Sequence, residues 1–148
     1  MGRLYRASSC LKYRESLLSP APVLRLKFYN VLGEEFPEEF EAPLDTGFEG
    51  SIMVTARDYE FFAVGELPRD YWRRYKTITG TIIMRVARAV VVASNKRIET
   101  YIEAPVFGIG KRLIGREFLK ELVVILDGPD SSCCVGKIEA ENAASLEP

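Results

Sequence analysis

The stretch "EAPLDTGFEGS", residues 41–51, ends an apolar segment with an acid, Asp45. Leu44 precedes this acid, and the hydroxyl of Thr46 and a glycine, Gly47, follow it. No basic residue lies within three positions of Asp45 on either side. A carboxylate in such surroundings needs either a structural partner or a chemical role.

The sequence before this stretch alternates as β-strands do. In "VLRLKFYN", Leu24, Leu26 and Phe28 face one way and the polar residues between them face the other, which is the period of a half-buried strand. Residues 36–44 then return as a second strand that ends at Asp45.

The rest of the chain is also rich in predicted strands. We expect short helices at 55–65, where Thr55 and Asp58 form a capping box and Gly65 ends the helix, and at 116–122. Residues 66–76 have the composition of a surface loop. The pattern lacks β-α-β alternation and predicts an all-β barrel or sandwich. The expected strands are 51–54, 77–93 with a turn at Thr79-Gly80, 97–107, 122–126 as a fully buried strand, and 133–138.

Length and composition describe one ordinary globular domain of 148 residues. The domain is expected over 21–138, with a tail or short helix at 1–20 and a tail at 139–148. A net charge of −1 argues against a general nucleic-acid binder. The chain has neither a run of 18 apolar residues nor the apolar core of a signal peptide, so we expect no membrane partner.

The three cysteines are an odd count and two of them, Cys133 and Cys134, are adjacent. This is a poor disulfide framework and favours a reducing, cytoplasmic location. Two adjacent thiols also make a poor metal site in a chain without histidine. A buried strand end or a dimer interface is the favoured position for this pair.

The chain has no histidine at all. This removes the commonest general base and the commonest metal ligand, so any catalysis must use carboxylates, Lys, Tyr, Ser, Thr or Cys. Two neighbouring carboxylates can share one proton, hold a water as base and protonate a leaving group. A second Asp-Thr-Gly or Asp-Ser-Gly does not occur, so the second carboxylate would be Asp45 of another copy.

A second motif, Leu113-Ile114-Gly115-Arg116, opens the segment "LIGREFLKEL". The two motifs, "LDTG" and "LIGREFLKEL", are separated by a glycine-tipped β segment. In this order and spacing, residues 22–128 resemble the subunit of a retropepsin-like aspartic protease. The "DTGF" form resembles small predicted prokaryotic aspartyl proteases. This resemblance implies a closed acid-protease β-barrel with one or two short helices, a two-fold homodimer, a peptide or protein substrate, and neither cofactor nor metal.

The resemblance also implies roles for individual residues. Asp45, Thr46 and Gly47 would be the catalytic loop, with the Thr46 hydroxyls crossing the two-fold axis. Leu113, Ile114 and Gly115 would support that loop, and Arg116 would pair with Glu49. A flap that closes on an extended peptide would be formed by Ile78, Thr79, Gly80 and Thr81, and Phe48 would join them in binding substrate.

Several alternatives stay open on the sequence alone. Asp45 can be the acid of an Asx turn in a monomeric barrel, and Arg116 a surface residue at a helix start. A dimeric domain of the same fold can bind peptides without cleaving them. "YWRRYK", 71–76, suits a solvated loop anchored by Trp72 better than a nucleic-acid patch. "GIGKRLIG", 108–115, lacks the ending of a phosphate loop.

Overall fold

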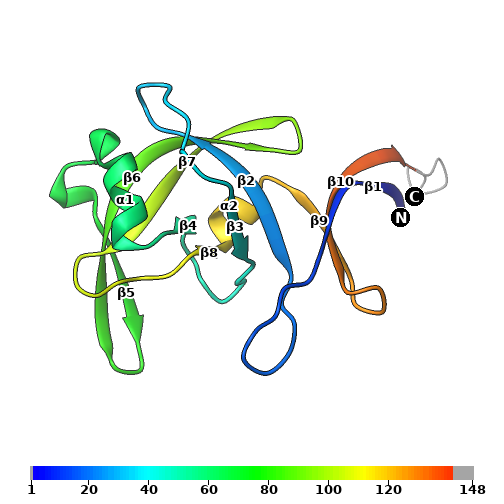
Figure 1. The fold of residues 1–148 in the computed structure, drawn as a ribbon, viewed down its shortest axis with the longest axis horizontal. Coiled ribbons are helices and arrows are strands. Elements are labelled where there is room, and N and C mark those ends of the chain that lie inside the picture. The colour runs from blue at the N-terminus through cyan, green and yellow to red at the C-terminus, as the bar shows by residue number, and fades with distance from the viewer. Residues whose placement is uncertain (1, 142–148) are drawn as a thin grey trace, which may run out of the picture.

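A computed structural model describes residues 2–141 of the chain, which are mostly β with a few short helices. The strands form a 7-stranded sheet and a 3-stranded sheet (Figure 1). The larger sheet has the order β3-β2-β6-β7-β4-β8, with β5 paired to β6, and the smaller has the order β1-β10-β9. The strands of the larger sheet are β2 (Val23–Tyr29), β3 (Phe40–Pro43), β4 (Ile52–Met53), β5 (Arg73–Thr77), β6 (Gly80–Ala93), β7 (Lys96–Pro105) and β8 (Leu113–Ile114).

The smaller sheet joins the two ends of the described chain. Its strands are β1 (Arg3–Lys12), β9 (Val123–Asp127) and β10 (Ser132–Glu141), and it projects to one side of the larger sheet (Figure 1). The helices are α1 (Ala56–Phe62) and α2 (Arg116–Leu119), with the 3-10 turns η1 (Ala63–Gly65) and η2 (Arg69–Tyr71).

The core lies between the larger sheet and α1. As the period-2 pattern predicts, Leu24, Leu26 and Phe28 on β2 are all buried. Phe28 meets the rings of Phe40 and Phe62 edge to face, at centroid distances of 4.5 and 5.5 Å. Such aromatic contacts stabilise the core beyond the area that they bury, so α1 is fixed against β2 and β3.

The predicted capping of α1 is confirmed. The Thr55 hydroxyl accepts from the Asp58 N–H at 3.1 Å, and the Asp58 carboxylate accepts from the Thr55 N–H at 3.4 Å. Both are backbone donors that a helix start leaves without intrahelical partners, so the box satisfies them reciprocally. The 3-10 turn η1 ends at Gly65, where the predicted helix was expected to stop.

The predicted turn at Thr79-Gly80 is also confirmed, since β5 and β6 form a hairpin around it. Gly80 adopts a φ of 133°, in the region that glycine alone enters without strain. The segment 66–76, expected as a surface loop, instead contains η2 and most of β5. Trp72 is half-buried there, and its indole N–H donates to the carbonyl of Leu67 at 3.1 Å.

The predicted closed barrel is wrong. β3 and β8 are the two edges of the larger sheet, and within residues 2–141 a single bridge joins them, between Leu44 and Ile114. The short β3 and the two-residue β8 offer too little backbone for a continuous ladder.

Two other predictions also differ from the structure. Residues 3–12, expected as a tail or short helix, form β1 against β10. The segment around 122–126, expected to be fully buried, forms β9, which is half-buried to exposed because it is an edge of the smaller sheet. Of the predicted tail 139–148, residues 139–141 belong instead to β10, and residues 142–148 lie outside the described part.

The prediction of a poor disulfide framework is wrong as well, whereas the expected position of Cys133 and Cys134 is confirmed, since both are buried near the start of β10. Cys10 and Cys134 face each other across β1 and β10 and form a disulfide, with their Cα atoms 4.0 Å apart. Cys133 is a free, buried thiol, and burial raises its pKa to about 11. The cytoplasmic location stays a prediction, but it loses the premise of a poor disulfide framework, since disulfides persist mainly in oxidising compartments. In the described residues, no helix is long and apolar enough to cross a membrane.

The disulfide predicts a redox-dependent stability. It closes a loop with a sequence separation of 124, so its reduction should lower the free energy of unfolding by about 2–4 kcal/mol. Urea unfolding with and without a reductant measures this difference. The double variant Cys10→Ala/Cys134→Ala is the control, because its unfolding should not respond to the reductant. An equal reductant effect in both proteins would contradict the assignment.

Candidate functional site

Asp45 follows β3 after one intervening residue, Leu44, and is half-buried at the start of a tight loop. The N–H of Gly47 donates to Asp45 Oδ1 at 2.9 Å, and the N–H of Phe48 donates to the Asp45 carbonyl at 3.1 Å. Within residues 2–141, no basic side chain forms an ion pair with Asp45. The carboxylate therefore has the local hydrogen bond of an Asx turn, while Oδ2 is left for another partner.

The backbone of residues 114–117 holds this loop. The Asp45 N–H donates to the Ile114 carbonyl at 2.9 Å, and the Gly115 N–H donates to the Ser51 carbonyl at 2.6 Å. Two more bonds run from the N–H groups of Arg116 and Glu117 to the loop carbonyls of Phe48 and Gly50, at 2.9 and 3.1 Å. The structure thus brings together the two motifs that the sequence analysis singled out.

Gly115 has no space for a side chain. A Cβ at this position would overlap the carbonyl oxygen of Gly50 and the ring of Phe48. The close approach of the two backbones explains why this position is a glycine. Arg116 and Glu49 form an ion pair at 3.6 Å, but both side chains are largely exposed, so the pair contributes little to stability.

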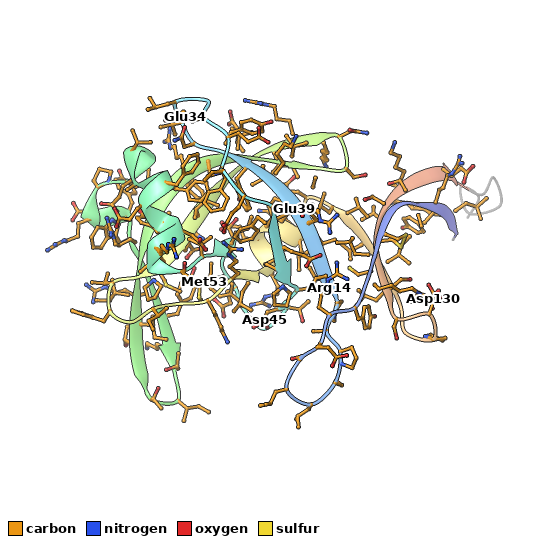
Figure 2. The ribbon with its side chains drawn as sticks, in the orientation of Figure 1. Arg14, Glu34, Glu39, Asp45, Met53 and Asp130 are labelled. Carbon is orange, nitrogen blue, oxygen red and sulfur yellow. A yellow bond between two sulfur atoms is a disulfide. The ribbon has the colours of Figure 1, made fainter. Side chains whose placement is uncertain are left out.

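A cavity of about 560 Å³ lies between the Asp45 loop and the β5–β6 hairpin. In Figure 2, Asp45 and Met53 lie at the lower centre of the molecule, beside this hairpin. Its apolar lining comes from Met53, Met84 and Leu113, and its charged rim includes Arg74 and Lys76. The other lining residues are Asp45, Gly47, Phe48, Glu49, Tyr75, Thr77 and Ile82.

The predicted substrate-binding residues divide into two groups. Phe48 lines the cavity, whereas Ile78, Thr79, Gly80 and Thr81 form the exposed tip of the hairpin and lie outside its lining. The Ile78 side chain is fully exposed. Thr46 is exposed at the loop and lies outside the lining as well. Sequence reasoning missed Met53 and Met84, because apolar residues in strands are indistinguishable from core residues in one sequence.

A buried carboxylate behind the loop gave no signal in the sequence. Glu103 on β7 has no exposed surface, and it accepts hydrogen bonds from Ser51, Arg73 and Tyr75. Burial raises the pKa of its carboxyl, and the bonds from Tyr75 and Ser51 oppose this shift. In one sequence a glutamate on a strand resembles an ordinary solvent-facing residue. Within residues 2–141, no three Cys, Asp or Glu side chains are arranged to hold a metal ion.

The chain matches no model of a known protein family and no curated protein sequence. Among solved structures it is similar to EIAV protease complexed with the inhibitor HBY-793. The identity is 15%, the TM-score is 0.45, and the match covers 73% of this chain and 93% of the EIAV protease chain.

The close packing at Gly115 predicts that even a small side chain at this position would destabilise the fold. Gly115→Ala should push residues 48–50 away from residues 114–117 and lower the free energy of unfolding by about 1–3 kcal/mol. The matched control is Gly128→Ala, since a Cβ at Gly128 would meet nothing within 4 Å. Urea unfolding of both variants checks this prediction. Equal stability of the two variants would show that the motifs are not in close contact.

Proposed function

We propose that this chain is the subunit of a homodimeric aspartic endopeptidase, with Asp45 of each copy forming the catalytic pair. The observation that carries the proposal is the environment of Asp45. This residue is half-buried, has no ion pair within residues 2–141 and borders a cavity that Met53, Met84 and Leu113 line in part. A carboxylate that served only the local turn would not need this cavity beside it. The resemblance of the two motifs to retropepsin-like proteases supports the same function.

The second copy follows from the sequence. A single Asp-Thr-Gly occurs in the chain, and a proton-sharing pair needs two carboxylates, so the pair forms across a two-fold axis. The exposed position of Thr46 beside Asp45 suits a contact with the other subunit. We assign Asp45, Thr46 and Gly47 to the catalytic loop and residues 113–115 to the support of that loop. The hairpin tip, residues 78–81, would form a flap.

The chemistry needs one ionised and one protonated carboxyl. The ionised carboxylate takes a proton from a water whose oxygen attacks the carbonyl carbon of the peptide bond. The protonated carboxyl donates to the carbonyl oxygen, which gains the electron pair of the broken π bond. When the tetrahedral intermediate collapses, the carboxyl that took the water proton donates it to the nitrogen and the carbon–nitrogen bond breaks. One hydroxyl of the intermediate re-forms the C=O bond and returns its proton to the other carboxylate, so the pair is again singly protonated.

Asp45→Asn tests the catalytic role. The amide cannot take a proton from water, so peptide cleavage should fall by at least about 100-fold while the fold and the dimer persist. The measurement is cleavage of a mixed peptide library between about pH 3 and pH 7, read by mass spectrometry. The control is Asp70→Asn, an exposed aspartate on η2. Full activity in Asp45→Asn would rule out the proposed pair. A stable wild-type dimer that cleaves no peptide would favour the peptide-binding alternative.

Thr46→Ala tests the proposed contact across the axis. In the proposed dimer each subunit donates one Thr46 hydroxyl bond to the other, so the variant loses two hydrogen bonds. This loss should raise the Kd of the dimer about tenfold. Sedimentation equilibrium gives this Kd directly. An unchanged Kd would remove Thr46 from the interface.

A further inference from the structure

The proposed chemistry leaves the buried carboxylate of Glu103 without a role. A fully buried carboxylate costs several kcal/mol unless donors surround it. Three donors do so here. The Ser51 N–H donates to Oε2 at 2.8 Å, Arg73 Nη1 donates to Oε2 at 2.9 Å, and the Tyr75 hydroxyl donates to Oε1 at 2.5 Å. Both carboxylate oxygens therefore have donors, and a buried polar network that is fully hydrogen-bonded makes the segments that it joins more rigid.

These donors come from the two walls of the cavity. Ser51 ends the loop that begins at Asp45, whereas Arg73 and Tyr75 belong to β5, the outer strand of the hairpin. Among the described residues, β5 pairs with β6 and forms no ladder with the loop or with β4. The hydrogen bonds to Glu103 therefore connect β5 directly with the loop, in addition to the backbone ladders that run from β6 through β7 to β4.

Tyr75 makes the connection at two points. Its hydroxyl donates to Glu103, and its ring lies against the ring of Phe48 at a centroid distance of 5.4 Å. Gly50 leaves the space for this arrangement, because a Cβ there would overlap Glu103, Phe48 and the Tyr75 hydroxyl. Burial and the bond to Glu103 raise the pKa of Tyr75, so its hydroxyl stays a donor near neutral pH.

Arg73 extends the connection to α2. Its guanidinium bonds both carboxylate oxygens of Glu117, at 3.0 and 3.1 Å, and a paired fork of this kind fixes orientation as well as distance. The backbone N–H of Glu117 in turn donates to the Gly50 carbonyl. The hairpin, the Asp45 loop and α2 thus meet at Glu103 and Arg73.

We propose that Glu103 is a positioning residue for the Asp45 site, which holds the β5–β6 hairpin against the Asp45 loop through Tyr75, Arg73 and Ser51. The kinetic part of this inference rests on the proposed function. Because the hairpin forms one wall of the cavity and the Asp45 carboxylate is not touched, the connection acts on substrate binding more than on the chemical step.

Tyr75→Phe tests the inference with the smallest change. The ring against Phe48 is retained and the hydroxyl is lost, so Glu103 Oε1 loses its donor. We expect faster amide hydrogen exchange in residues 45–51 and 73–77, and an increase of about tenfold in KM for peptide cleavage with kcat changed less. Glu103→Gln should change the same two segments in the same direction, and it carries the test if Tyr75→Phe fails to fold.

Tyr59→Phe is the matched control. Tyr59 is buried, whereas Tyr75 is half-buried. The Tyr59 hydroxyl also donates to a carboxylate, Glu66, at 2.8 Å, but Tyr59 lies on α1. A general loss of stability would appear in both variants, whereas a change confined to 45–51 and 73–77 should follow Tyr75→Phe alone. Unchanged exchange in both segments would overturn the inference, whatever the activity. If Tyr75→Phe exchanges faster in these segments but the wild-type dimer cleaves no peptide, the connection would be supported and the proposed function rejected.

Discussion

Four backbone hydrogen bonds between residues 45–51 and residues 114–117 are the constraint on which the site depends. They form where the two edges of the larger sheet approach each other, at the bridge between Leu44 and Ile114. Buried peptide groups must find partners, and here each segment supplies them for the other. The bonds fix the start of the Asp45 loop, and their closeness requires a glycine at 115.

Sequence patterns correctly predicted the elements that are determined by residues close to one another in the chain. The alternation of β2, the capping box at Thr55 and the turn before Gly80 all follow from neighbouring residues. The two motifs around Asp45 and Gly115 were also recognised, although their contact comes from the fold. The missed features depend on distant partners. β1 is a strand because β10 lies beside it, and Cys10 meets Cys134 for the same reason. β9 looked fully buried, but its apolar residues occupy a sheet edge.

Two carboxylates near the cavity have opposite surroundings. Asp45 is half-buried and has one hydrogen bond from its own loop, so it retains the capacity to bind water or a second carboxyl. Glu103 is completely buried and has donors on both oxygens, so it has no capacity for a ligand. The first arrangement suits chemistry and the second suits positioning. Sequence reasoning found Asp45 because a motif surrounds it, and it missed Glu103 because its donors come from Ser51 and β5.

The central claim is that two copies of Asp45 share one active site, and mixed dimers test it most directly. Wild-type chains and Asp45→Asn chains are mixed in equal amounts and allowed to exchange. Peptide cleavage by the mixture is compared with that of the wild type alone at the same total protein concentration. If each active site needs both carboxylates, random pairing leaves about one quarter of the dimers active. A fall to about one half would mean that each subunit works with its own Asp45, and would contradict the shared pair.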